Sequence, residues 1–157
     1  MSDIETMIDL LTERQRHEFA VACSRRVQHL MTNQRSVAAI DTREQWLRGE
    51  ATDKEMNEAW AAAWAEVQDA ENTKWATEQN ASKAAALAAS GAAAETAEAV
   101  AEALAWAGSG SVDRRHERAW QHRELKRMLR KEYDRIRNSQ MSNEANTNNT
   151  LFREGKL

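Results

Sequence analysis

Histidine and cysteine are the residues of this chain best suited to metal or nucleophilic chemistry, but their spacing assembles no site. The histidines are His17, His29, His116 and His122, and no HExxH motif occurs among them. His116 and His122 are six residues apart, which places them on different sides of a helix. Cys23 is the only cysteine, so a disulfide within the chain or a cysteine-based zinc site is excluded. We predict no metal site and ordinary surface or half-buried histidines.

The residues needed for other catalytic chemistry are also missing. Cys23 lies on the apolar side of a predicted helix, whereas a nucleophilic cysteine needs a paired base and an accessible thiolate. The glycines at 108 and 110 follow no predicted strand and precede no P-loop lysine. No pair of carboxylates stands out from the glutamates of the helix surfaces. The sequence therefore predicts a protein that is not an enzyme and binds no cofactor.

Charge is the feature that points to a partner. Residues 113–137 hold ten Lys or Arg against five acids, and residues 50–104 hold eleven acids against three lysines. Such an asymmetry indicates either a charged partner or two segments of the chain that face each other.

The basic segment gives the first candidate surface. Its second half has an apolar face that runs from Leu125 to Ile136, and Trp120 points almost opposite to it, among basic residues. An aromatic residue ringed by arginines is typical of a protein-interface hot spot or of a nucleic-acid stacking site. The alternative is that the first turns of this helix pack on the core through Trp120 and its neighbours. We define the basic candidate surface as Trp120, Arg123, Arg127 and Lys131.

The acidic segment gives the second candidate surface. Glu95, Glu98 and Glu102 share one side of a predicted helix, and Trp106 lies close to that side. The Gly-Ser-Gly-Ser link at 108–111 would fold the basic helix back beside these glutamates. Three interpretations are therefore open: matching of charges within the chain, a surface that faces a partner, and a face that is only solvated. We define the acidic candidate surface as Glu95, Glu98, Glu102 and Trp106.

The elements that carry these surfaces are all predicted to be helices. The chain has no proline and five glycines, and good helix formers dominate. Capping boxes at Thr12 and Thr52 predict two helix starts, and Gly49 and Gly91 predict two ends. Tryptophans recur at intervals of about fifteen residues, which favours a layered array. We expect one domain of five or six helices over 1–137, comprising an alanine-rich array (12–107) and a basic helix (112–137), then a flexible tail (138–157).

Location follows from two absences in the sequence. Residues 1–11 carry three acids and no basic group, unlike a signal peptide, and no run of about eighteen apolar residues occurs. We expect no membrane contact and a cytoplasmic protein.

Several segments of the chain resemble a family of alanine-rich helical immunity proteins of bacterial polymorphic toxin systems, which has relatives in phages and prophages. The resemblance covers roughly residues 12–130. It implies inhibition by binding, without catalysis, in the cytoplasm of a bacterium or of a phage-infected host. The similar segments are Ala22–Val27, Ser36–Glu50 with its Trp46-Leu47-Arg48-Gly49-Glu50 end, the Ala/Trp stretch from Ala59, Glu117–Gln121 and Leu125–Leu129.

The functional hypothesis is a non-catalytic inhibitor that occludes a protein partner, either a toxin or a component of host defence. Two alternatives stay open: nucleic-acid binding through the basic helix at 113–137, against which the net charge of −3 argues, and a phage structural or assembly oligomer.

Overall fold

The computed structural model describes residues 3–73, 75–108 and 110–155, and the prediction of an all-α fold is confirmed within these ranges. The described chain contains seven α-helices and one short 3-10 helix, and no strand. The helices are α1 (Asp3–Asp9), α2 (Glu13–Arg26), α3 (Gln34–Leu47), α4 (Asp53–Thr73), α5 (Ala76–Ser90), α6 (Ala93–Ala107) and α7 (Ser111–Arg153), and the 3-10 turn is Gln28–Leu30.

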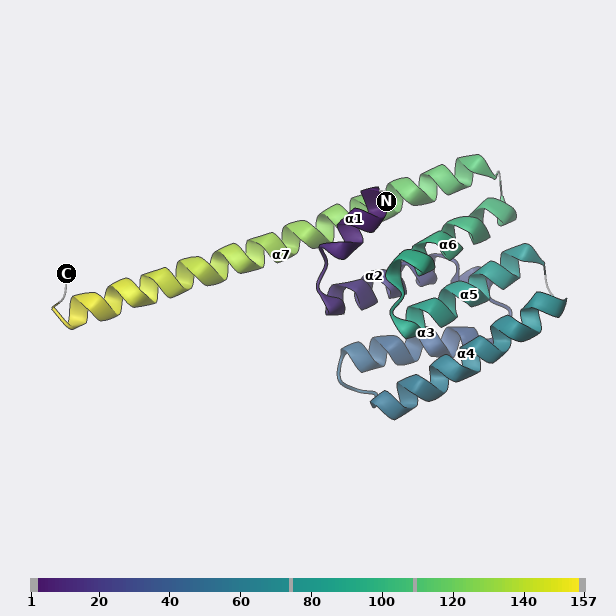
Figure 1. Ribbon diagram of the computed structural model, residues 1–157, viewed down its shortest axis with the longest axis horizontal. Helices are drawn as coiled ribbons and strands as arrows, with labels where there is room; N and C mark the ends of the chain where they lie inside the picture. The colour runs from purple at the N-terminus through teal and green to yellow at the C-terminus, as the bar shows by residue number, and fades with distance from the viewer. Residues whose placement is uncertain (1–2, 74, 109, 156–157) are drawn as a thin grey trace.

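The helices form two offset layers (Figure 1). Helices α4, α5, α6 and α7 follow one another as antiparallel neighbours. Helices α3, α2 and α1 cover one face of that layer in reverse order: α3 packs on α4 and α5, α2 on α5 and α6, and α1 on α6 and α7. The long α7 runs past the others and leaves the body of the molecule. A layered array is therefore the observed architecture.

Helix ends follow the local signals of the sequence. At Thr12 the hydroxyl accepts a hydrogen bond from the Gln15 backbone N–H, and the Gln15 side chain accepts one from the Thr12 backbone N–H. Thr52 and Glu55 form the same reciprocal pair before α4. Gly91 ends α5 in the left-handed conformation, with φ of 81°, and a Cβ there would overlap the His17 ring. The turn between α5 and α6 thus requires glycine.

Alanine builds most of the core. The buried faces of α5 and α6 consist almost entirely of alanine, which lets these two helices pack closely against each other. Phe19, Ile40 and Leu125 are the largest apolar side chains that are fully buried. None of the six tryptophans is fully buried, although Trp46, Trp64 and Trp120 pack against the core clusters.

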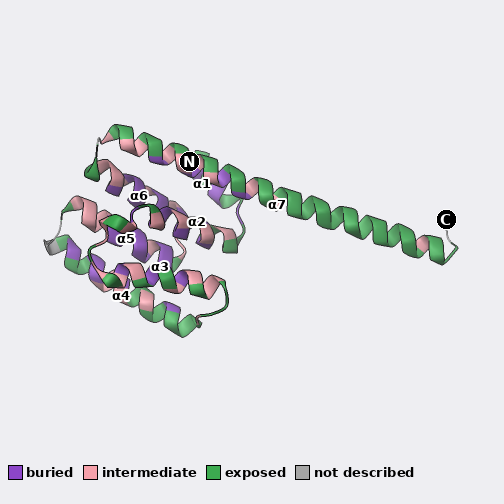
Figure 2. Ribbon diagram, turned by 180° about the vertical axis from the view of Figure 1, so that it is seen from behind, coloured by how far each residue is buried: buried purple, intermediate pink, exposed green. Residues whose placement is uncertain are grey.

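Both ends of the chain depart from the sequence-based expectation. Residues 3–9, for which we predicted no helix, form α1, whose Ile4, Met7 and Ile8 are buried against α6 and α7. Helix α7 does not end at Arg137, and the segment predicted as a flexible tail is helical through Arg153. Beyond Met128 this helix has no buried residue within the described chain, as Figure 2 shows.

Candidate interaction surfaces

The acidic candidate surface lies largely at a seam within the molecule. Glu98 on α6 forms ion pairs with both Arg114 and Arg118 of α7, and Glu102 forms one with Arg114. The short connection between α6 and α7 makes the two helices antiparallel neighbours, so the carboxylates of one face the guanidinium groups of the other. Charge matching within the chain, the alternative left open above, accounts for these two glutamates.

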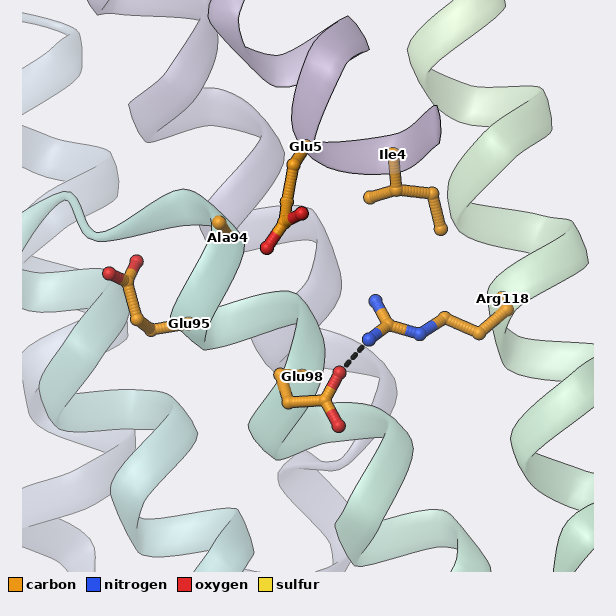
Figure 3. A pocket seen from close by; sticks show the side chains of 6 residues that line it. All are labelled: Ile4, Glu5, Ala94, Glu95, Glu98 and Arg118. Atoms are coloured by element: carbon orange, nitrogen blue, oxygen red, sulfur yellow. Dashed lines mark ion pairs between the residues drawn. The ribbon is translucent and has the colours of Figure 1, made fainter. Parts of the chain in front are cut away.

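A hollow of about 310 Å³ opens at one end of this seam, between α1, α6 and α7 (Figure 3). Glu98 and Arg118 meet across it, whereas the Glu95 side chain points away from Arg118. Glu95 is exposed and Glu5 lines the opposite wall. The charged groups that line this hollow are three carboxylates and the Arg118 guanidinium, and the Glu98–Arg118 pair among them links α6 to α7.

Trp120 of the basic candidate surface packs against the core. Its ring contacts the main apolar cluster, and the Arg26 guanidinium stacks on its outer side, 4.1 Å from the ring centroid. Arg26 also donates to the fully buried Glu117 carboxylate at 2.7 Å. The Gln121 amide donates to Glu117 and to the Ala97 carbonyl. Trp120 therefore packs beside a polar network that joins α2, α6 and α7. This agrees with the alternative prediction that the first turns of α7 pack on the core.

The other members of the basic candidate surface lie on exposed parts of α7. Arg127 pairs with Glu124 one turn away, which holds the pKa of that carboxyl below its usual range. Arg123 and Lys131 are exposed and form no ion pair or hydrogen bond within the described chain. Arg123, Arg127 and Lys131 follow one another at intervals of four residues on one side of α7. Trp120 adds little to this patch, because it packs against the core and Arg26 stacks on its ring.

Two tryptophans are exposed at the same end of the array. Trp75 is the N-cap residue of α5 and is 84% exposed, and Trp106 lies near the end of α6 and is 64% exposed. Because α5 and α6 are antiparallel helices of equal length, the start of one lies beside the end of the other (Figure 1). We call this pair the tryptophan end. Trp106 was predicted as an interface residue and Trp75 was not. The position of Trp75 just before a predicted helix could have indicated that its side chain is exposed.

A second hollow, of about 380 Å³, lies between α2, α3 and α4. Arg43 caps α5 there by donating to the Ala89 carbonyl, and it stacks over Trp46 at 4.6 Å. The His17 ring meets Trp46 edge-on, and burial together with the Arg43 charge lowers the pKa of His17. The Trp46 indole N–H donates to Asp53. This cluster fastens the C-terminal end of α5 to α3.

Cys23 and His122 have structural roles, whereas His29 and His116 are exposed. The Cys23 thiol is fully buried in the core, and burial raises its pKa well above the usual range, which makes it a poor nucleophile. His122 contacts the Asp3 carboxylate at 2.6 Å and fastens α1 to α7. Among the described residues, no group of three His, Cys, Asp or Glu side chains is placed to hold a metal ion.

No family model, curated protein or solved structure matches this chain. None of the helices within the described ranges combines the length and the apolar character needed to cross a membrane.

Proposed function

We propose that this chain is a non-catalytic protein that binds a protein partner and inhibits it by covering its surface. The observation that carries the proposal is the tryptophan end, where Trp75 at the start of α5 and Trp106 near the end of α6 are both exposed at the same end of the array. Tryptophan is the residue type most enriched among interface hot spots, because it buries a large apolar area at a small entropic cost.

Folding does not account for these two side chains. An N-cap position favours Ser, Thr, Asp or Asn, and Trp75 makes no side-chain capping hydrogen bond to α5. Neither indole belongs to an apolar cluster of the core. An exposed tryptophan at such a position contributes little to stability, whereas its burial by a partner would remove about 150–250 Å² of mostly apolar surface from water.

The resemblance to immunity proteins supports inhibition as the purpose of binding. The partner would be a toxin, if the chain is an immunity protein, or a component of host defence, if it is a phage protein. Both roles place the chain in the cytoplasm of a bacterium or of a phage-infected host. Both also require occlusion alone, which agrees with the buried thiol of Cys23 and with hollows lined by paired charges.

The test is affinity capture from host lysate with the tagged chain, followed by mass spectrometry. Wild type is compared with the double variant Trp75→Ala/Trp106→Ala. Trp60→Ala is the matched control, because Trp60 is 41% exposed but lies in the first half of α4, away from the tryptophan end. We expect one protein in fixed stoichiometry with wild type and with the control, and its loss with the double variant.

Two results would overturn the proposal. One is capture of the same partner, in the same yield, by the Trp75→Ala/Trp106→Ala variant. The other is recovery of only the chain itself, as a stable oligomer. If light scattering gives the same mass for this oligomer in wild type and in the double variant, an assembly protein is favoured.

A further inference from the structure

The outer face of α7 carries five cations that have no partner among the residues that the structure describes. All five side chains are exposed, and none forms an ion pair or hydrogen bond within the described chain. At about 100° per residue they fall within an arc of about 80°, centred opposite to the buried Glu117, Gln121 and Leu125. We call them the outer basic stripe: Arg115, Arg123, Lys126, Arg130 and Arg137.

Three acidic residues of α7 near the stripe are engaged elsewhere, and Asp134, within one turn of Arg130 and Arg137, forms no ion pair in the described chain. Glu117 faces inward and is paired with Arg26, while Glu124 and Glu132 pair with Arg127 and Arg135. No Asp or Glu between residues 112 and 143 falls within the arc, and Asp134 lies about 20° outside it. Glu144 does fall within the arc, about two turns beyond Arg137, so the purely basic row ends at Arg137. The stripe is therefore a row of like charges.

Such a row costs the free protein stability. Arg123 and Lys126 are three residues apart, and Lys126 and Arg130 are four apart, so they repel one another across single helical turns. Each like-charged pair destabilises a helix by about 0.2–0.5 kcal/mol. Helix stability thus gives no reason for the arrangement, whereas a polyanion would relieve the repulsion.

The dimensions of the stripe fit a DNA duplex. From Arg115 to Arg137 the helix rises about 33 Å, close to one turn of B-DNA at about 34 Å. Beyond Arg130 the helix stands clear of the body, straight and exposed on all sides (Figures 1 and 2). A free helix of about 10–12 Å diameter matches the width of the DNA major groove, whereas the major groove of an RNA duplex is too deep and narrow.

The free part of α7 also has the side chains that contact base edges. Residues 138–150 contain six amides, and Glu144 is the only charged residue among them. Amide groups of Asn and Gln donate to and accept from adenine in the major groove. Single-stranded nucleic acid fits less well, because it is held by stacking on aromatic rings and Tyr133 is the only aromatic residue among the stripe.

We propose that α7 binds double-stranded DNA, with the outer basic stripe on the phosphates and the free helix beyond Arg130 in the major groove. The net charge of −3 does not oppose this, because the acids of the chain concentrate in residues 50–104 and the stripe presents only positive charge along its length. The inference is independent of the protein-binding proposal, since the tryptophan end and the stripe share no residue.

The test is fluorescence anisotropy of a labelled duplex of about 20 base pairs, titrated with the full chain at several salt concentrations. Five phosphate contacts predict a slope of log K against log salt of about −4.5. Arg123→Gln/Arg130→Gln should weaken binding roughly 50-fold near 0.1 M salt and make the slope shallower by about 1.8. Arg127→Gln/Arg135→Gln is the matched control, because it removes the same charge from the same helix outside the arc, and it should change affinity by less than about threefold.

Equal losses in the two double variants would overturn the inference, because binding would then depend on net charge and not on the stripe. So would the absence of DNA binding at about 50 mM salt. Equal or tighter binding to a single strand or to an RNA duplex of the same sequence would overturn the assignment to double-stranded DNA. The assignment would also be wrong if DNA did not bind and the chain instead captured an acidic protein through Arg123 and Arg130. A circular dichroism spectrum equal to wild type excludes misfolding as the cause of any loss.

Discussion

Replacing Arg26 with alanine removes the cation that compensates the buried Glu117 carboxylate. Glu117 is fully buried, and its hydrogen bonds come from the Arg26 guanidinium at 2.7 Å and the Gln121 amide at 3.1 Å. In Arg26→Ala one charge-assisted bond is lost, and the charge stays between α2, α6 and α7 with the amide alone. The cation–π contact to Trp120 is lost at the same time.

The expected cost is about 2–3 kcal/mol of unfolding free energy. Breaking a fully buried ion pair costs about 3–5 kcal/mol, because the remaining charge is left uncompensated. Arg26 keeps 36% of its side chain exposed, so water can reach the Glu117 carboxylate in the variant, which lowers this cost to about 1.5–2 kcal/mol. Loss of the cation–π contact adds about 0.5–1 kcal/mol. Arg127→Ala, which breaks an exposed pair with Glu124, should cost less than about 0.5 kcal/mol.

The assay is urea unfolding followed by circular dichroism, in a double-mutant cycle with Glu117→Leu. Because the double variant buries no charge, Arg26→Ala/Glu117→Leu should be more stable than the sum of the single variants predicts, by at least about 1.5 kcal/mol. If Arg26→Ala costs no more than Arg127→Ala, or if the two single changes add, the network does not hold the seam and the reasoning is wrong.

Four further predictions concern stability and accessibility. Gly91→Ala should lower the unfolding free energy measured in urea by roughly 3 kcal/mol or more, because the backbone has a positive φ and the new Cβ would overlap the His17 ring. Gly49→Ala also lies at positive φ but in open space, so it should lower the unfolding free energy by only about 1 kcal/mol. Cys23 should react with a thiol reagent only as fast as the protein unfolds, and rapid labelling of the native protein would contradict its burial. The pKa of His17 is lowered from 6.5 in the folded state, so the unfolded chain takes up the proton first; stability should fall as the pH drops below 6.5, and His17→Leu should flatten that part of the profile. Truncation after Arg137 should leave the unfolding free energy within about 0.5 kcal/mol of wild type, because residues 138–155 are almost wholly exposed; a larger loss would place them in the cooperative unit.

The helix boundaries that could be predicted are those set by local chemistry. The capping boxes at Thr12 and Thr52 start helices where the hydroxyl can accept from the third backbone N–H, and Gly91 ends one where only glycine fits. The folding of α7 beside α6 was among the alternatives, because the Gly-Ser-Gly-Ser link is short and the charges on the two sides are opposite. These features need no knowledge of the packing.

Tertiary packing decided the features that the sequence did not indicate. A helical projection puts Trp120 away from the apolar face of α7, but its large ring reaches the core from the side and Arg26, on a helix far along the chain, covers it. Apolar residues at positions 4, 7, 8 and 11 have the spacing of one helix face and indicate helix α1. The acidic residues between them made this pattern easy to miss. The asparagine-rich segment after Arg137 favours a frayed end by propensity, yet it contains no proline and no glycine before Gly155, and the helix runs to Arg153.

The prediction that the chain acts through the tryptophan end is tested most directly by hydrogen–deuterium exchange on the captured complex, compared with the free chain. We predict slower exchange at the start of α5, around residues 75–80, and at the end of α6, around residues 103–108, with the first half of α4 unchanged. Protection confined to α7 or to α3 and α4, with exchange at both tryptophan segments as fast as in the free chain, would contradict it.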